Sequence, residues 1–184
     1  MKNNINVEAL KGYMSELSEN KQPGSIDYNL DLEWVGGTQT KVHTQEVVLD
    51  NNVEKRDFTF MVDEPLELLG KNEHPTPQEY LLAGMGSCMM VGFVVGASMK
   101  GIELTKLNIK INSGLDLNGF LQTKPGAPVP LKQVEYVIEV EGDGTQEEFD
   151  EIHEVVKKTS PNRATIANAI DIVSNVKVLD PKSN

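Results

Sequence analysis

The strongest feature of the sequence is an uncharged, mostly apolar run from Tyr80 to Met99, with signals for a helix start before it and a helix stop after it. Thr76 can cap the first turn, Pro77 suits the first helical position, and Glu79 completes a Thr-x-x-Glu capping box. Lys100-Gly101 provides a cation for the last turn and a glycine that can end the helix. The pattern predicts one helix of roughly 24 residues that is apolar on nearly every side and therefore needs cover on nearly every side.

Lipid or protein could provide that cover. The run is long enough for a membrane span, and Gly92-x-x-x-Gly96 is a spacing found where membrane helices pack. However, its glycines and serines make the run only moderately apolar, no cluster of positive charge flanks it, and it lies in mid-chain. We therefore expect the buried helix of a soluble protein, without a membrane partner, in which the glycines mark the close approach of other elements.

The chain before this helix carries a helical stripe followed by strand patterns. Apolar residues at helical spacing predict a short helix over Asn6–Leu17, within an N-terminal docking unit of residues 1–20. From Ile26 to Trp34 apolar and polar residues alternate strictly, which is the pattern of a strand with one buried face. Residues 25–65 are expected to form an antiparallel meander, with a turn at Gly36-Gly37, a second strand over about Gln39–Leu49, a turn at Asp50-Asn51-Asn52 and a third strand marked by Phe58, Phe60 and Val62.

Residues 76–184 are expected to hold the long helix, preceded by a loop over Leu66–Pro75, and a second set of strands and helices. Alternation predicts strands over Lys106–Asn112 and Val134–Val140, separated by an exposed, proline-rich loop at Gly119–Pro130.

Two shorter helices are expected near the C-terminus. Thr145-x-x-Glu148 is a second capping box, and it opens a helix that ends at Ser160-Pro161. The same Ser-Pro pair can start a short helix over Asn162–Ala169, and a last strand is expected over about Asp171–Leu179. The residues of the first of these helices that are expected to face inward are Phe149, Ile152, Val155 and Val156.

This order of elements predicts an α+β fold, in which antiparallel sheets pack around a long, buried central helix in a single domain over residues 1–184. One chain of this size can hardly cover a helix that is apolar on every side and still fold the rest. We therefore expect a homodimer that shares this helix in its interface.

Composition narrows the classes of function. The net charge is -11, and such an acidic surface repels phosphate backbones, so no nucleic-acid partner is expected. The N-terminus has no apolar signal-peptide region, and we expect a cytoplasmic protein. A single cysteine excludes an internal disulfide, and the three histidines are far apart with no Cys/His spacing typical of metal sites, so no metal and no cofactor are expected.

Cys88, near the middle of the apolar run, is the first candidate for chemistry. It is either a small buried hydrophobe or a nucleophilic thiol. Gly84 and Gly92 share its side of the helix, so a groove beside the sulfur could hold a substrate. Because Cys88 lies too far along the helix for the N-terminal dipole to act on it, and because apolar burial disfavours a thiolate, a reactive sulfur needs a positive charge from elsewhere in the structure.

Few residues can supply that charge. Arg56 and Arg163 are the only arginines in the chain. Arg56 lies in a polar stretch that is typical of a solvated turn, whereas Arg163 follows a helix start and could either point at a neighbouring site or lie on the surface. Glu79 is explained as the capping-box carboxylate, while Gln78 beside it has no obligatory structural role.

The segment Pro75-Thr-Pro-Gln-Glu-Tyr-Leu-Leu-Ala-Gly-Met-Gly-Ser-Cys88 resembles the helix start and cysteine of the OsmC/Ohr family of organic hydroperoxide reductases. Asp63-Glu64-Pro65 before the helix, Gly101-Ile102 after it, and the Glu148–Ile170 pattern with its Ser-Pro turn extend the resemblance over most of the chain. It implies an OsmC-like, intertwined homodimer with sites at the subunit interface. It also implies peroxide chemistry, in which a thiolate is oxidised to a sulfenic acid and then captured by a second cysteine as a disulfide.

The resemblance assigns roles to particular residues. Cys88 stands at the peroxidatic position, and Ser160, which cannot form a disulfide, stands at the position of the resolving cysteine. The family's glutamate, which orients a catalytic arginine, corresponds to Gln78, one place before Glu79. Because the loop before the helix carries no arginine, Arg56 is the candidate for the catalytic arginine.

Three hypotheses follow. The first is an OsmC-like homodimer with Cys88 as its only possible redox centre, either a one-cysteine thiol peroxidase that reduces organic hydroperoxides and is reduced by an external thiol, or a non-catalytic relative. The second is a binding protein for a small apolar ligand, whose pocket is the groove beside Cys88 lined by Gly84 and Gly92, with Met85, Met89 and Met90 nearby. Arg163 is a further possible residue of the site lining. The third is a structural core without a site.

Overall fold

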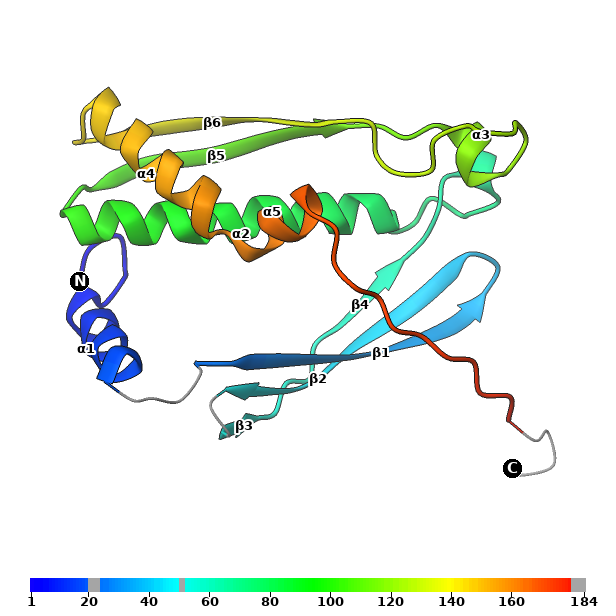
Figure 1. Ribbon diagram of the computed structural model, residues 1–184, viewed down its shortest axis with the longest axis horizontal. Coiled ribbons are helices and arrows are strands. Elements are labelled where there is room, and N and C mark those ends of the chain that lie inside the picture. The colour runs from blue at the N-terminus through cyan, green and yellow to red at the C-terminus, as the bar shows by residue number, and fades with distance from the viewer. Residues whose placement is uncertain (20–23, 50–51, 180–184) are drawn as a thin grey trace.

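The computed structural model describes residues 1–19, 24–49 and 52–179, and it confirms the predicted α+β fold with antiparallel sheets and one long helix. Figure 1 shows that helix, α2, with strands β5 and β6 along one side and the sheet of β1 to β4 on the other side. The elements in chain order are α1 (Val7–Glu19), β1 (Ile26–Gly36), β2 (Gln39–Leu49), β3 (Asn52–Glu54), β4 (Thr59–Val62), the 3-10 helix η1 (Leu66–Leu68), α2 (Pro77–Lys100), β5 (Leu104–Ser113), α3 (Leu117–Phe120), β6 (Val134–Gly142), α4 (Gln146–Thr159) and α5 (Pro161–Ala167).

The predicted ends of α2 are confirmed. The hydroxyl of Thr76 accepts a hydrogen bond from the main-chain N–H of Glu79 at 3.2 Å, and the carboxylate of Glu79 accepts one from the N–H of Thr76 at 2.7 Å. Gly101 ends the helix with a left-handed φ of 80°, a conformation that suits glycine. The capping box thus binds the first turn of α2 to the loop before it.

The protomer covers α2 on one side only. Its buried side chains pack against β5, β6 and α4, where Phe149, Ile152 and Val156 complete the core. On the other side Leu81 and Val91 are 49% and 65% exposed. The sequence requires cover on nearly every side of α2, and a single chain does not provide it. The buried residues of the helix are Met85, Gly86, Met89, Phe93, Ala97 and Ser98.

By length and composition alone, α2 could cross a membrane. Within the protomer, however, 33% of the apolar span is already buried. The core helix of a soluble protein meets the same criteria of length and composition, and α2 packs against β5 and α4.

The N-terminal sheet forms as predicted but is not buried as predicted. β2 pairs antiparallel with β1, β3 and β4, and the turn at Gly36-Gly37 joins the first two strands. The apolar face of β1 was expected to be covered, yet Leu32 and Trp34 are 66% and 74% exposed. The expected burial is wrong for the protomer because no other element of the described chain packs on this face of the strand.

Several smaller expectations need correction. The sequence did not predict β3. A turn was expected at Asp50-Asn51-Asn52, and its first two residues lie outside the described chain. The 3-10 helix η1 lies in the expected loop before α2, and α3 begins just before the proline-rich loop, with Asp116 as its cap. These additions are short elements within segments that the sequence marks as turns.

The C-terminal part contains two further corrections. Thr145 and Ser160 cap the starts of α4 and α5 as expected, and α5 spans Pro161–Ala167 instead of Asn162–Ala169. Val155, which was expected to face inward, is 57% exposed. The inward face of α4 is narrower than expected, since Phe149, Ile152 and Val156 fill it. The last strand over Asp171–Leu179 is absent, because this apolar segment pairs with no strand of the described chain.

The N-terminal residues dock on the chain through Asn3. The Asn3 amide donates to the Ser98 hydroxyl at 3.0 Å and to the carbonyl oxygen of Ile102 at 2.9 Å, and its oxygen accepts from the N–H of Leu104 at 2.8 Å. No residue of α1 is buried. The predicted helix forms, and the hydrogen bonds of Asn3, in the residues before it, attach the N-terminus to the end of α2 and the start of β5.

A buried carboxylate, Asp63, connects the N-terminal sheet to the loop that precedes α2. Its side chain is fully buried at the end of β4. Burial opposes the charged form, but hydrogen bonds from main-chain N–H groups and a hydroxyl outweigh it and lower the pKa of Asp63 to about 2. The donors to the two carboxylate oxygens are the N–H groups of Glu64, Lys71 and Glu73, the Thr38 hydroxyl and the Gln39 amide.

We predict that Asp63→Asn lowers the thermal unfolding midpoint, because an amide replaces one charged acceptor oxygen with a donor that faces other donors. The pKa of Asp63 is lowered on folding from 3.8 to about 2. Its stabilising contribution is therefore present above pH 4 and is lost as the pH falls towards 2. Thermal melts over this range should show a smaller acid-induced loss in Asp63→Asn than in the wild type, whereas equal losses would contradict the role of Asp63. The exposed Asp57→Asn is the matched control.

Candidate functional site

The thiol of Cys88 lies halfway along α2 and is half-buried. Met85, about one turn before it, and Met89, the next residue, are buried against the β5 and β6 side of the helix. The apolar sequence of α2 thus places the sulfur at the boundary between the covered and the exposed sides of the helix.

Ser160 is the side chain that contacts this sulfur. It is buried at the junction of α4 and α5, where its N–H donates to the carbonyl oxygen of Val156 at 3.0 Å. Its hydroxyl donates to the Sγ of Cys88 at 3.3 Å and accepts from the N–H of Arg163 at 3.4 Å. The Ser-Pro step that ends one helix and starts the next therefore also brings an O–H group to the thiol.

The glycines of α2 make this contact possible. A Cβ atom added at Gly92 would lie 3.3 Å from Val156, and one added at Gly96 would lie 3.0 Å from Ile152. These glycines thus mark the close approach of α4, as the sequence predicted. A larger residue at either position would push α4, and with it Ser160, away from the helix.

The same packing corrects the expected groove beside Cys88. A Cβ atom at Gly84 would lie 3.6 Å from the side chain of Asn162, whose amide donates to the carbonyl oxygen of Gly84 at 2.8 Å. Because α5 covers Gly84 and α4 covers Gly92, the glycine side of α2 is occupied by protein. Met85 and Arg163, the other two residues expected at the site, border a separate cavity.

The other predicted site residues lie away from the thiol. Glu79 is held by the capping box, and its hydrogen bonds to Thr76 lower its pKa. Arg56 lies between β3 and β4 with its guanidinium 4.9 Å from the centre of the Phe58 ring. Within the described chain, no hydrogen bond or ion pair joins Arg56, Gln78 or Glu79 to Cys88.

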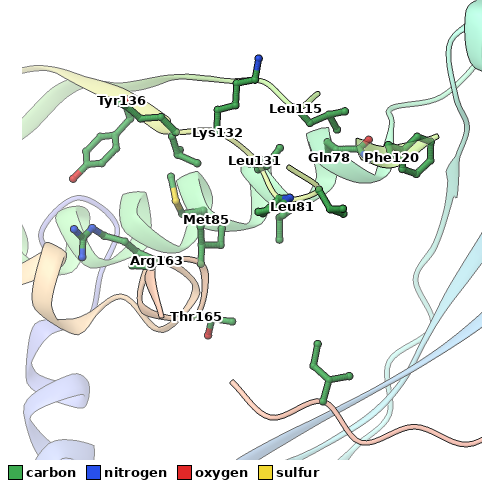
Figure 2. A pocket seen from close by; sticks show the side chains of 17 residues that line it. Gln78, Leu81, Met85, Leu115, Phe120, Leu131, Lys132, Tyr136, Arg163 and Thr165 are labelled. Carbon is green, nitrogen blue, oxygen red and sulfur yellow. The ribbon is translucent and has the colours of Figure 1, made fainter. Parts of the chain in front are cut away.

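The cavity has a volume of about 910 Å³ and lies between the first half of α2, helix α5 and the segment from α3 to β6. Figure 2 shows Leu81, Met85 and Leu131 along it, with Tyr136 and Arg163 at one end and Leu115 and Phe120 at the other. Gln78 also borders it. Cys88 is not among the residues that line this cavity.

Sequence reasoning missed the polar pair beside Arg163. The hydroxyl of Tyr136 and the Nε2 atom of His153 are 2.9 Å apart, and their rings meet edge to face. Burial, followed by the positive charge of Lys157, lowers the pKa of His153, and Arg163 acts in the same direction. The available signals were the inward register of Tyr136 on its strand and the position of His153 beside Ile152 on α4. Neither shows by itself that the two side chains meet.

No group of three or more metal-ligating side chains comes together in residues 1–19, 24–49 and 52–179. The chemistry that the arrangement offers is that of one thiol with a hydroxyl donor beside it. Ser160 can stabilise a thiolate or an oxidised sulfur by hydrogen bonding, but it cannot capture the sulfur in a disulfide.

Comparison with known proteins shows what the chain as a whole is similar to. No curated protein matches the chain. Among solved structures, an OsmC-like protein from Mycoplasma pneumoniae has 16% identity and a TM-score of 0.57, over 80% of this chain and 89% of that one. An OsmC-like protein of unknown function from Vibrio cholerae has 11% identity and a TM-score of 0.56, over 76% and 92%. An organic hydroperoxide resistance protein from Elizabethkingia anophelis has 21% identity and a TM-score of 0.48, over 81% and 93%.

At these identities the likeness to the Mycoplasma pneumoniae and Vibrio cholerae proteins shows the fold alone. The sequence itself matches the family model described as OsmC-like protein over residues 70–175, a segment that contains α2 with Cys88 as well as α4 and α5 with Ser160. The chain therefore belongs to the OsmC-like protein family.

Proposed function

We propose that this OsmC-like protein is a one-cysteine thiol peroxidase that reduces organic hydroperoxides, with Cys88 as its only redox centre. The observation that carries the proposal is the contact between the Ser160 hydroxyl and the Cys88 sulfur at 3.3 Å. At the place where the OsmC/Ohr resemblance expects a resolving cysteine, this chain has a side chain that can assist the sulfur but cannot form a disulfide with it.

The proposed reaction has two stages. The Cys88 thiolate attacks one peroxide oxygen, so that an S–O bond forms, the O–O bond breaks, and the alkoxide leaves as an alcohol after it takes a proton. The sulfur is thereby oxidised to a sulfenic acid. An external thiol then attacks the sulfenic acid to give water and a mixed disulfide, and a second thiol releases Cys88 together with an external disulfide.

Ser160 is proposed as a positioning residue for this sulfur. A hydroxyl that donates to a thiolate forms a charge-assisted hydrogen bond, which favours the reactive form over the neutral thiol. Because the chain has one cysteine, the reductant that regenerates the Cys88 thiol must come from outside the chain. We therefore infer residence in the cytoplasm, where small thiols are kept reduced.

We further propose that the protein acts as a homodimer. The uncovered side of α2 with Leu81 and Val91, the exposed face of β1 with Leu32 and Trp34, and the unpaired apolar segment over residues 170–179 are more apolar surface than a soluble monomer usually presents. A second copy would cover these surfaces by symmetric contacts. In this proposal Arg56 acts on the sulfur only if the partner brings it there.

The first prediction concerns peroxide. Adding an organic hydroperoxide should consume the Cys88 thiol, and a sulfenic-acid trap should add one label per chain by intact mass. Ser160→Ala should react more slowly, by roughly 10- to 100-fold, if the hydrogen bond to the charged sulfur is lost. Cys88→Ser should take up no label and have no thiol-dependent peroxidase activity.

A matched variant separates this effect from a loss of fold. Thr159→Ala removes a neighbouring exposed hydroxyl that bonds only to its own helix, and it should react like the wild type. Melting curves of both variants account for the loss of the α5 cap in Ser160→Ala, which costs about 1 kcal/mol. A Cys88 thiol that stays reduced under excess hydroperoxide contradicts the proposed function.

The second prediction converts the site to two-cysteine chemistry. Ser160→Cys places a second thiol against Cys88, and mild oxidation should then close a disulfide, with loss of both thiols and faster migration on a non-reducing gel. The bridge joins positions 72 residues apart, and loop closure over that length predicts a stabilisation of about 4 kcal/mol against unfolding. Thr159→Cys, whose side chain points to solvent, should keep both thiols. Two free thiols in oxidised Ser160→Cys would show that the two side chains do not meet.

The third prediction concerns the dimer. Trp34 is the only tryptophan in the chain and is exposed in the protomer. If a second copy covers the apolar face of β1, its fluorescence should be protected from acrylamide quenching. Leu32→Glu, on the same face, should remove that protection, whereas Glu33→Gln on the opposite face should keep it. If acrylamide quenches the Trp34 fluorescence of the wild type as strongly as that of free tryptophan, the proposed dimer interface on β1 is contradicted.

A further inference from the structure

The junction between α4 and α5 is attached to α2 by hydrogen bonds at two points, one helical turn apart. In Figure 1 the two helices meet beside the middle of α2. The Ser160 hydroxyl donates to the Sγ of Cys88 at 3.3 Å, and the side-chain amide of Asn162 donates to the carbonyl oxygen of Gly84 at 2.8 Å. The first contact belongs to the proposed peroxidase site. The second contact caps neither α4 nor α5, so helix capping does not account for it.

The Asn162 contact lies on the helical turn that carries the thiol. In an α-helix a carbonyl oxygen accepts from the N–H group four residues later, so the Gly84 carbonyl belongs to the same turn as the N–H of Cys88. A Cβ atom added at Gly84 would lie 3.6 Å from the amide nitrogen of Asn162. The start of α5 is therefore fixed on α2 one turn before the sulfur.

The backbone between the two contacts is stiff. Asn162 follows Ser160 by two residues, and the ring of Pro161 between them fixes its φ. The residue before a proline is restricted to extended conformations, and Ser160 has a φ of -72° and a ψ of 112°. A displacement of Asn162 from α2 is therefore transmitted to Ser160.

The second hydrogen bond of the Ser160 hydroxyl leaves its proton for the sulfur. Ser160 is buried, and its Oγ accepts from the main-chain N–H of Arg163 at 3.4 Å. A hydroxyl has a single proton, and this proton remains available to Cys88. Because a hydrogen bond weakens steeply as its angle departs from linear, the contact with the sulfur depends on where the junction lies on α2.

We propose that Asn162 is a positioning residue for the peroxidase reaction, and that its amide anchors the α4–α5 junction on the Gly84 carbonyl and so keeps the Ser160 hydroxyl at the sulfur of Cys88. Asn162 bonds to the Gly84 carbonyl and not to the sulfur, so it acts through Ser160. Its effect on the reaction rate rests on the proposed function. The anchoring of Ser160 does not, and it can be measured without a hydroperoxide.

Asn168 provides a matched control. Its side-chain amide donates to the carbonyl oxygen of Ala164, also at 2.8 Å, but this bond closes the C-terminal end of α5 itself. Asn162→Ala and Asn168→Ala therefore each remove one exposed amide and one hydrogen bond of the same length from the same part of the chain. Only Asn162→Ala removes a bond between α5 and α2.

The geometric test uses Ser160→Cys and measures the effective concentration of its two thiols, by equilibrating the full-length protein with reduced and oxidised glutathione. Adding Asn162→Ala should lower this concentration by roughly 3- to 10-fold, because one of the hydrogen bonds that hold the junction is lost and water already competes for the exposed amide. Adding Asn168→Ala should leave it unchanged. Equal values for the two double variants would overturn the proposal, and so would the absence of a disulfide in Ser160→Cys.

The kinetic test measures the oxidation of Cys88 by an organic hydroperoxide. Asn162→Ala should slow the oxidation by roughly 3- to 10-fold, whereas Asn168→Ala should not. In the Ser160→Ala background Asn162→Ala should cause no further loss, because a positioning residue has no effect once the group that it positions is removed. An equal loss in both backgrounds would show that Asn162 does not act through Ser160 and would overturn the proposal.

The two tests separate this inference from the proposed function. If the wild-type Cys88 is not oxidised, the proposed function fails, and the role of Asn162 in the rate fails with it. The effective concentration of the two thiols in Ser160→Cys still supports or overturns the anchoring of the junction by Asn162, because no hydroperoxide enters that measurement.

Discussion

The structure depends on how a long helix without charge is covered. Over its span from Tyr80 to Met99, α2 has no side on which solvent is the natural neighbour. The protomer covers the side that faces β5, β6 and α4, and it leaves Leu81 and Val91 exposed. The apolar face of β1 is likewise exposed in the protomer. The proposed homodimer is the arrangement that satisfies both surfaces.

The covered side of α2 determines the chemistry. Gly92 and Gly96 let α4 approach so closely that Ser160, the residue that caps its C-terminal end, reaches the sulfur of Cys88. The same junction starts α5, and α5 places Arg163 at the cavity rather than at the thiol. One packing contact therefore yields two distinct places, a thiol with a hydroxyl donor and an apolar cavity with a cationic end.

Much of the fold could be predicted from the sequence, because caps and periodicity are local signals. Both capping boxes, the Gly36-Gly37 turn and the ends of α2 are confirmed. The errors involve long-range contacts. The burial of β1 and the strand over Asp171–Leu179 need a neighbour that the described chain does not provide, and no local pattern shows this. For the site, the motif indicated Cys88 and Ser160, whereas the covering of Gly84 by Asn162 and the pairing of Tyr136 with His153 depend on how distant elements pack.

The central claim is that a second copy completes the cover of α2. The most direct test is the molar mass of the full-length protein in solution, measured by light scattering during size exclusion at micromolar concentration and without detergent. The chain mass is 20.3 kDa, and the account predicts twice that value, unchanged on dilution. A stable, soluble species at the mass of a single chain would contradict it, because α2 and β1 would then keep their apolar faces in water.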